Sequence, residues 1–348
     1  MYDVIIVGAG VAGCYLAQRL QNLDLNVLIL EKDKKIILKD SGIVSLKFLN
    51  FFPEEFIKNE ISRIDFVSPS ENILSLQSRK PFALIIKRKK FSRDLRKNLT
   101  IKYERVEKIK DRKIFTNKNE YEYKMLVGAD GANSVVAKYI GSQTRNVVGM
   151  FSFSNKINFS DITVFLNKNF SDFFSWVIPQ NKECGLIANK NPRKCFENFK
   201  NKLNLPLRKF YAFPIPLGYT KSYADNCILV GDACGYTKPL TGGGIIFSLI
   251  SSKYASEIIF EAFKKERFDS KFLKRYEKYC LPIRKEIERQ LWIRNFYERL
   301  TNKDIDYLFR EFSGIKFNNI AENYDNLSNL AKSIPKSKML KAFFKVIF

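Results

Sequence analysis

A glycine turn directly after the first apolar run sets the strongest limit on how this chain can fold. The β-branched run Tyr2 to Val7 leads into Gly8-Ala9-Gly10-Val11-Ala12-Gly13. The first glycine permits a tight turn, the second lets a ligand approach the backbone, and the third lets a helix pack against the strand. The pattern predicts a strand over Tyr2 to Val7, a helix over Val11 to Gln21 and a second strand over Asn26 to Leu30.

This opening is typical of a site for a dinucleotide. Phosphates bind at the positive end of the helix that begins at Val11. Glu31 ends the second strand, eighteen positions after Gly13, where a carboxylate can accept hydrogen bonds from ribose hydroxyls. A purely structural glycine turn is the simpler alternative, and the motif does not distinguish FAD from NAD. The predicted contacts of the dinucleotide are Gly8, Gly10, Ala12, Gly13, Glu31 and Lys32.

Two more glycine turns follow later apolar runs. Leu126 to Gly131 reads as a strand that enters a Gly-Asp-Gly turn, which alone says little about function. Cys227 to Val230 is a buried strand that delivers the carboxylate of Asp232. The cluster Gly242, Gly243 and Gly244 then opens a long helix, predicted over Gly243 to Lys265. Backbone N–H groups in such a cluster favour negative charge, including the anion of a reduced flavin. A flexible hinge is the alternative interpretation.

Together, the three motifs resemble the FAD-binding architecture of the aromatic hydroxylase superfamily, from Tyr2 to about Tyr279. The resemblance implies that Asp130 and Gly131 contact the cofactor and that Asp232 binds its ribityl side. Lys87 to Leu95 is similar to a superfamily segment with Arg, then Phe-Asp, then Leu, although Ser92 replaces the usual acid. Arg88 is therefore a cofactor candidate, with a solvated helix residue as the alternative.

The third motif is most similar to the signature of the geranylgeranyl reductase family. Phe174-Ser175-Trp176-Val177-Ile178-Pro179 is similar to that family's Tyr-x-Trp-x-Phe-Pro motif, whose strand lines a lipid tunnel beside the flavin. The resemblance makes Phe174, Trp176 and Pro179 tunnel candidates, whereas core packing is the simpler explanation for Trp176 alone. Members often carry a Cys-Gly pair near the flavin, for which Ser41-Gly42 is the nearest counterpart here. The resemblance thus adds Ser41, Gly42, Gly231, Asp232, Pro239, Gly242, Gly243, Gly244 and Ile245 to the cofactor set.

The expected architecture is α/β. The resemblance and the order of the elements predict an FAD-binding Rossmann-like domain of the aromatic hydroxylase-like (GR2) type, interrupted by an antiparallel β-sheet substrate domain and followed by a helical C-terminal region. We assign residues 1–48, 87–145 and 220–275 to the first, 49–86 and 146–219 to the second, and 276–348 to the third. Local patterns predict a basic helix over Lys87 to Asn98, two or three strands over Ile101 to Val127, and a helix over Pro192 to Leu203.

The composition restricts the chemistry and the partners. The chain has no His, and none of its six Cys form a CxxC pair, so we expect no metal site and no Ser-His or Cys-His nucleophile. The formal charge of +24 suits phosphate head groups or an anionic membrane surface, although a skewed overall composition would also explain it. The basic residues are spread along the chain, which makes nucleic acid an unlikely partner.

These properties predict a cytoplasmic protein, with peripheral contact at the inner face of the cell membrane as a further expectation. The apolar run after Met1 is too short for a signal peptide and ends in glycines. The tail Lys336 to Phe348 alternates Lys with Met339, Leu340, Phe343 and Phe344. It fits an interfacial anchor, but an ordinary capping helix is the preferred interpretation.

The resemblance implies an FAD-dependent oxidoreductase acting on CH–CH groups. Its reaction would reduce isolated C=C bonds in the geranylgeranyl chains of archaeal-type isoprenoid lipids or prenyl diphosphates, by hydride transfer from reduced flavin. Without His, the proton must come from a Tyr, a Cys, an acid or bound water, and no catalytic residue is identified. NAD(P)H and ferredoxin both remain open as electron donors. The alternatives are a flavin-dependent monooxygenase or halogenase, because halogenases carry a comparable Trp-x-Trp-x-Ile-Pro motif, and a basic flavin-binding protein without catalysis.

Overall fold

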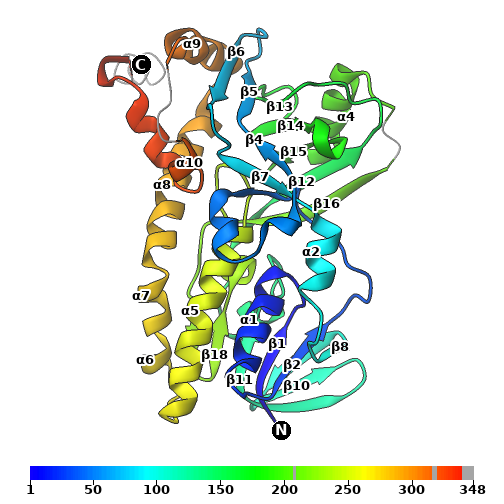
Figure 1. The fold of residues 1–348 in the computed structure, drawn as a ribbon, viewed down its shortest axis with the longest axis vertical. Helices are drawn as coiled ribbons and strands as arrows, with labels where there is room; N and C mark the ends of the chain where they lie inside the picture. Colours follow the sequence, from blue (N-terminus) through cyan, green and yellow to red (C-terminus); the bar gives the residue numbers. More distant parts are fainter. Residues whose placement is uncertain (207–208, 316–319, 339–348) are drawn as a thin grey trace.

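The computed structural model describes residues 1–206, 209–315 and 320–338. An eight-stranded sheet lies at one end of the molecule and a seven-stranded sheet at the other, with a three-stranded sheet at the side between them (Figure 1). Residues 339–348 of the proposed anchor lie outside the described residues. The mixed α/β architecture confirms the predicted fold class, whereas the domain boundaries stay a prediction.

The eight-stranded sheet begins the chain. Its main path is β17-β18-β11-β1-β2-β8, and β1 is parallel to both neighbours. The region predicted to hold two or three strands contains four, because Asp111 and Arg112 take left-handed backbone conformations and turn the chain into an extra hairpin. The strands are β1 (Tyr2–Val7), β2 (Val27–Glu31), β8 (Ile101–Tyr103), β9 (Val106–Lys110), β10 (Lys113–Thr116), β11 (Glu120–Gly128), β17 (Tyr223–Ala224) and β18 (Cys227–Leu229).

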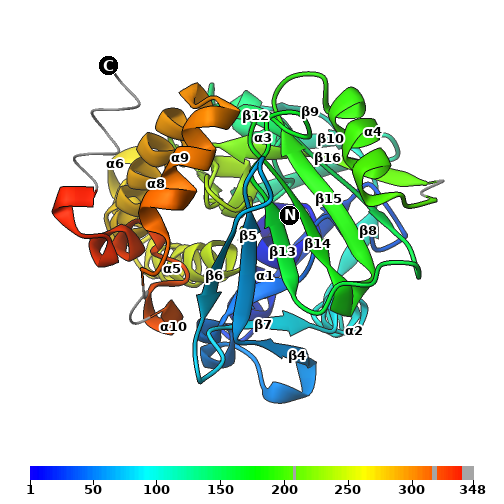
Figure 2. The same ribbon diagram turned by 90° about the horizontal axis from the view of Figure 1, so that it is seen from above.

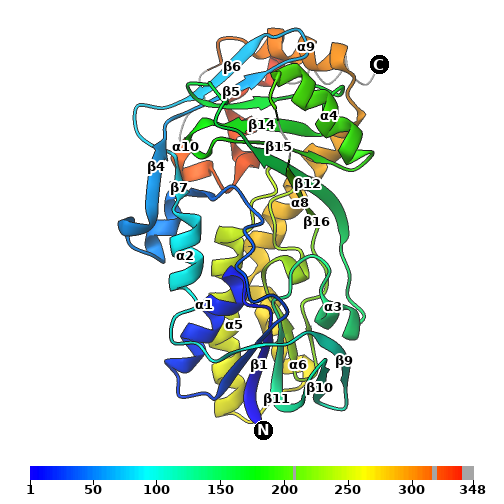
Figure 3. The same ribbon diagram turned by 90° about the vertical axis from the view of Figure 1, so that its right-hand side faces the viewer.

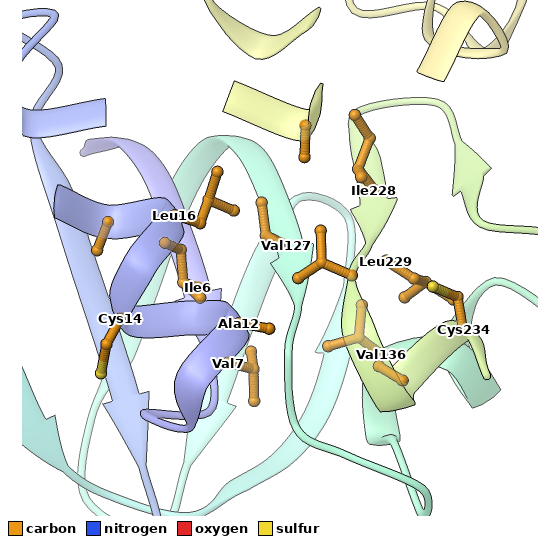
Figure 4. Packing of buried hydrophobic residues seen from close by; sticks show 14 of the residues in the cluster. Ile6, Val7, Ala12, Cys14, Leu16, Val127, Val136, Ile228, Leu229 and Cys234 are labelled. Atoms are coloured by element: carbon orange, nitrogen blue, oxygen red, sulfur yellow. The ribbon is translucent and has the colours of Figure 1, made fainter. Parts of the chain in front are cut away.

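The central parallel strands of this sheet are buried on both faces, so they are apolar nearly throughout. Helices α1 (Val11–Gln21) and α5 (Ile245–Lys264) pack against each other, and the Ser252 hydroxyl of α5 donates to the Ala12 carbonyl of α1 at 2.9 Å. Figure 4 shows Leu16 of α1 beside Ile6 and Val127 from neighbouring strands, all fully buried. Helix α3 (Val135–Tyr139) follows β11.

The seven-stranded sheet runs in the order β16-β12-β15-β14-β13-β5-β6. It is antiparallel as predicted, except that β5 and β13 pair in parallel. Helix α4 (Pro192–Leu203), at its predicted position, lies across one face of this sheet (Figures 2 and 3). The strands are β5 (Arg63–Val67), β6 (Ile73–Gln77), β12 (Arg145–Phe153), β13 (Ile162–Phe165), β14 (Phe174–Ile178), β15 (Glu183–Ala188) and β16 (Phe210–Leu217).

The two faces of this sheet differ. Because side chains alternate along a strand, Cys184 and Leu186 of β15 point towards α4 and join its core. Glu183, Gly185 and Ile187 therefore point to the opposite face, which is turned towards the rest of the molecule.

A small sheet and a column of helices complete the fold. Strands β3 (Ile43–Ser45), β7 (Ala83–Ile86) and β4 (Ile57–Ile61) pair in that order, and α2 (Arg88–Asp94) follows β7. Helix α2 is shorter than predicted, ending before Asn98, which adopts a left-handed conformation. The column consists of α6 (Ser270–Leu273), α7 (Arg275–Tyr279) and α8 (Leu281–Arg299), and it starts beside α5 (Figure 1). Helix α9 (Asn302–Phe312) follows at the top of the molecule next to β6, and α10 (Ile320–Asn323) completes the described helices. Within the described ranges, no helix has the length and apolar character needed to cross a membrane.

Candidate functional site

The glycine turn between β1 and α1 has the geometry that its sequence predicts. Gly8 has a φ of +105°, and a Cβ on Gly13 would collide with the Gly8 carbonyl oxygen. A Cβ on Gly10, in contrast, would have no heavy atom within 4 Å. Two of the glycines are thus needed for packing, whereas the third leaves open space at the start of a helix, where a pyrophosphate would fit.

Glu31 and Arg96 hold this turn from two sides. The Ala9 N–H donates to Glu31 Oε2 at 2.8 Å, and Arg96 Nη2 donates to the Ala9 carbonyl at 2.9 Å. Among the described residues, the buried Arg96 Nη1 has no hydrogen-bond partner. A buried cationic N–H without a partner, beside an open helix start, fits a phosphate ligand. No sequence motif pointed to Arg96. Lys32, which was predicted to contact the dinucleotide, is exposed.

The second glycine turn, Leu126 to Gly131, lies against the first, but the carboxylate of Asp130 forms hydrogen bonds with residues just after it in the chain. A Cβ on Gly8 would collide with the backbone of Ala129. Asp130 accepts hydrogen bonds from the Ser134 hydroxyl at 2.5 Å and from the Val135 N–H at 2.6 Å. Burial raises the pKa of Asp130. In this structure Asp130 therefore stabilises the start of α3, and the predicted cofactor contacts of Asp130 and Gly131 stay predictions.

The third motif joins the first at Gly231. This residue has a φ of +59°, and a Cβ on it would lie 3.0 Å from the Ala12 Cβ. The next residue, Asp232, accepts from the Thr237 hydroxyl at 2.7 Å, and burial raises its pKa. A Cβ on Gly244 would lie 2.7 Å from Asp232 Oδ1. The Asp232 carboxylate and the triple glycine (Gly242, Gly243 and Gly244) thus form one surface.

The triple glycine also faces the seven-stranded sheet. Gly242 has a φ of +69°, and a Cβ on it would lie 2.9 Å from the Ile187 Cδ1 and 3.3 Å from the Ile215 Cδ1. The helix after the glycines begins at the buried Ile245, two residues later than predicted. Pro239, which precedes them, is buried, and its carbonyl accepts from Arg294 Nη1 at 2.9 Å.

A second group of predicted residues meets around Arg88. Its guanidinium is 11% exposed and forms an ion pair with Asp40, which excludes the solvated alternative. The Gly42 N–H donates to Asp40 Oδ1 at 2.8 Å, and a Cβ on Gly42 would lie 2.6 Å from the Arg88 Cδ. In the part of the chain that the structure describes, the buried Arg88 Nε has no partner.

Trp176 lies on the sheet face that is turned towards these residues. A Cβ on Gly185 would collide with the Trp176 indole, so the ring covers this glycine of the neighbouring strand. The indole N–H donates to Glu183 Oε1 at 3.0 Å, and the Ser41 hydroxyl donates to the same oxygen. Phe174 packs beside Trp176 with ring centroids 5.7 Å apart, whereas Pro179 lies beyond the end of β14.

Aromatic residues continue this face on β12 and β16. Phe151 stacks on Tyr211 with centroids 5.5 Å apart, and Phe213 packs beside them. Lys39 Nζ lies 6.0 Å from the centroid of Phe213. The face that meets the triple glycine is therefore largely apolar, with Glu183 as a buried acid within it.

Comparisons with known proteins agree with this geometry. Residues 2–159 match the family of pyridine nucleotide-disulphide oxidoreductases. An uncharacterized protein from Methanocaldococcus jannaschii is 26% identical over 99% of this chain and 98% of its own. A digeranylgeranylglycerophospholipid reductase from Methanococcus vannielii is 24% identical over 99% and 97%, respectively. The chain is an FAD-dependent oxidoreductase, and several of its relatives are named digeranylgeranylglycerophospholipid reductase.

Two solved structures share the fold of this oxidoreductase. A geranylgeranyl bacteriochlorophyll reductase-like protein from Thermoplasma acidophilum has a TM-score of 0.83 at 20% identity, covering 96% of this chain and 97% of its own. The flavin-dependent brominase Bmp2 has a TM-score of 0.69 at 15% identity, covering 95% and 93%. These likenesses establish the fold, which reductases and halogenases share.

The residues of this oxidoreductase fit FAD at two points. The open space at Gly10 and the unpartnered Arg96 Nη1 suit the pyrophosphate, and the surface of Asp232 and Gly244 suits the polar edge of a sugar or a flavin ring. Sequence motifs alone could not identify Arg96 or Glu183. Arg96 is one of many basic residues in its segment, and Glu183 gains its position only when β15 pairs with β14.

Proposed function

We propose that this oxidoreductase saturates isolated C=C bonds in the geranylgeranyl chains of archaeal-type isoprenoid membrane lipids or of prenyl diphosphates. The observation that carries the proposal is the apposition of Gly242 with Ile187 and Ile215, which sets the triple glycine against the apolar face that holds Trp176. The name of the relatives with matching length, digeranylgeranylglycerophospholipid reductase, supports the same chemistry.

The side chains of this face suit a hydrocarbon substrate. Phe174, Trp176 and Ile187 offer apolar and aromatic contact surface to a prenyl chain. An apolar surround also excludes water, which would otherwise trap positive charge that develops on the alkene carbon. When FAD is bound in its reduced form, it supplies the hydride. The proposed reaction also requires a route by which the lipid reaches the site and a source of the proton.

The net charge supports a role at a membrane surface. A formal charge of +24 attracts phosphate head groups and anionic lipids, so that the protein would extract its substrate from the inner face of the cell membrane. Either NAD(P)H or a ferredoxin would supply electrons. Incubating the oxidised protein with each donor without oxygen separates these two alternatives. The absorbance of the oxidised flavin should disappear with the true donor.

Reoxidation of the flavin tests the proposal directly. Purified holoprotein is reduced without oxygen, and a geranylgeranylated phospholipid is added while the flavin absorbance is followed. We expect oxidised flavin to reappear with this lipid and not with a fully saturated phytanyl lipid of the same head group. Flavin that stays reduced with both lipids would contradict the proposal.

A flavin-dependent halogenase or monooxygenase is the second candidate, because the brominase shares the fold over 95% of this chain. Such an enzyme needs oxygen to turn over. The candidate would be favoured if reoxidation required air and the product carried oxygen or a halogen. The same assay in air, with and without bromide, distinguishes it from the reductase.

A further inference from the structure

A buried acid connects the two predicted parts of the site. Glu183 is only 2% exposed, at the start of β15. Its Oε1 accepts both from the Trp176 indole, on the predicted substrate strand, and from the Ser41 hydroxyl, on the loop after β2. Since Ser41 precedes Gly42, which is packed on Arg88, the acid lies between the substrate strand and a predicted cofactor segment.

The two hydrogen bonds leave one oxygen of this acid for a proton. Both donors meet Oε1, and no described residue donates to Oε2. The charged groups that influence Glu183 are Asp40 and Lys58; Asp40 pairs with Arg88, and Lys58 Nζ donates to the Gln180 carbonyl at 2.6 Å. Burial raises the pKa of Glu183, although the hydrogen bonds from Ser41 and Trp176 act in the opposite direction. A carboxyl in such a place can keep its proton at a pH where exposed acids are ionised.

Other proton carriers on this side of the molecule are less suitable. The chain has no His. Cys184, the nearest cysteine in sequence, points towards α4, away from this face, and burial raises its pKa to about 12. Tyr297 is a further competitor, because it packs on Phe173 and its buried hydroxyl has no partner among the described residues.

We propose that Glu183 stores the proton used in the reduction on Oε2 and gives it to the substrate, while Ser41 and Trp176 hold Oε1. This inference rests on the proposed function. The C=C bond accepts a hydride at one carbon, from the reduced flavin, and a proton at the other. The Glu183 carboxyl gives the proton on Oε2 to that carbon, which leaves a carboxylate that water reprotonates. Ser41 and Trp176 hold the carboxyl in place and are therefore positioning residues.

The proton on Glu183 can be detected without substrate or cofactor. The chain has two Trp, and Trp292 is 66% exposed, so Trp292→Phe leaves Trp176 as the only indole. In the W292F apoprotein we expect the Trp176 fluorescence to titrate with a midpoint above that of an ordinary Glu, and E183Q to abolish the titration. Gln keeps an acceptor for both donors but holds no acidic proton. An identical titration with E183Q would overturn the proposal.

Single turnovers of the reduced holoenzyme test the step itself. General acid catalysis contributes roughly 100-fold or more, so E183Q should slow lipid reduction by about that factor, flatten its pH profile and leave FAD content and lipid affinity unchanged. E104Q is the matched control, since Glu104 is also a buried, hydrogen-bonded acid but lies in the β9–β10 region. It should react like the wild type.

Three outcomes separate the claims. Equal rates and pH profiles for E183Q and the wild type would overturn the role of Glu183 while leaving the proposed function intact. A large loss in Y297F together with a normal rate in E183Q would assign the proton to Tyr297 and likewise overturn it. If the wild type itself reduces no lipid, the proposed function fails, whereas the fluorescence titration still decides whether Glu183 holds the proton.

Discussion

Lys238 Nζ lies 3.0 Å from Asp325 Oδ1, and both side chains are at most 5% exposed. The pair connects the segment after α10 with the loop that leads into the triple glycine. Burial alone would raise the pKa of Asp325, but Lys238 and the Ser45 hydroxyl hold it below its usual value. The Lys238 Cε would lie 3.1 Å from a Cβ on Gly243, so this ion pair supports the turn from behind.

Breaking the pair from one side should destabilise the protein strongly. Asp325→Ala leaves a buried, unpaired ammonium, which typically costs about 3–5 kcal/mol. Urea unfolding of the apoprotein, followed by circular dichroism, measures this change. The double variant Lys238→Met, Asp325→Leu should recover most of the lost stability, because it removes both charges. If Asp325→Ala alone were as stable as the wild type, the ion pair between Lys238 and Asp325 would not form in the protein.

Two glycines of the first turn should respond in opposite ways to alanine. Gly13→Ala forces a Cβ against the Gly8 carbonyl oxygen, and we expect a loss of about 3 kcal/mol in the free energy of unfolding of the apoprotein. Gly10→Ala meets no protein atom, so the apoprotein should keep its stability while the Kd for FAD rises at least about tenfold. Chemical unfolding and flavin fluorescence titration provide the two readouts. Equal effects of both substitutions on the apoprotein would contradict this assignment.

Arg96 should contribute to cofactor affinity. Its free Nη1 would donate to a phosphate, and hydrogen bonds to charged groups contribute about 1.5–3 kcal/mol. Arg96→Met should therefore raise the Kd for FAD by about tenfold or more, measured by calorimetry. Lys97→Met removes an exposed neighbouring charge and serves as the control, with an unchanged Kd expected. A similar loss in both variants would point to long-range charge instead of a specific contact.

Stability should depend on pH through Glu183. Its pKa is raised in the folded state, so the folded protein binds this proton more tightly than the unfolded chain does. The resulting stabilisation is present below the pKa of the unfolded chain and is lost as the pH rises through the folded value. Glu183→Gln should remove this pH-dependent stabilisation. As the pH rises, the free energy of unfolding of the wild type should therefore fall relative to that of the variant. A difference that is constant from acid to neutral pH would contradict the raised pKa.

The sequence was informative where a local pattern determines local structure. Strand β1 and helices α1 and α4 have their predicted bounds, since apolar periodicity and Gly or Pro positions mark them. The extra hairpin at Asp111 and Arg112 was missed because left-handed conformations at non-glycine residues leave little trace in a sequence. Contacts between distant segments were also beyond prediction. Ser41 and Glu183 are separated by 142 positions, and only the tertiary fold brings them together.

The measurement that tests the central claim most directly is the mass of the lipid product. Reduced holoprotein is incubated with a geranylgeranylated phospholipid under strictly anaerobic conditions, and the lipid is extracted for mass spectrometry. We predict a rise in mass by whole hydrogen pairs, with deuterium incorporated into the lipid when the reaction runs in deuterated water. A lipid that remains unchanged without oxygen, and that gains oxygen or halogen only in air, would contradict the account.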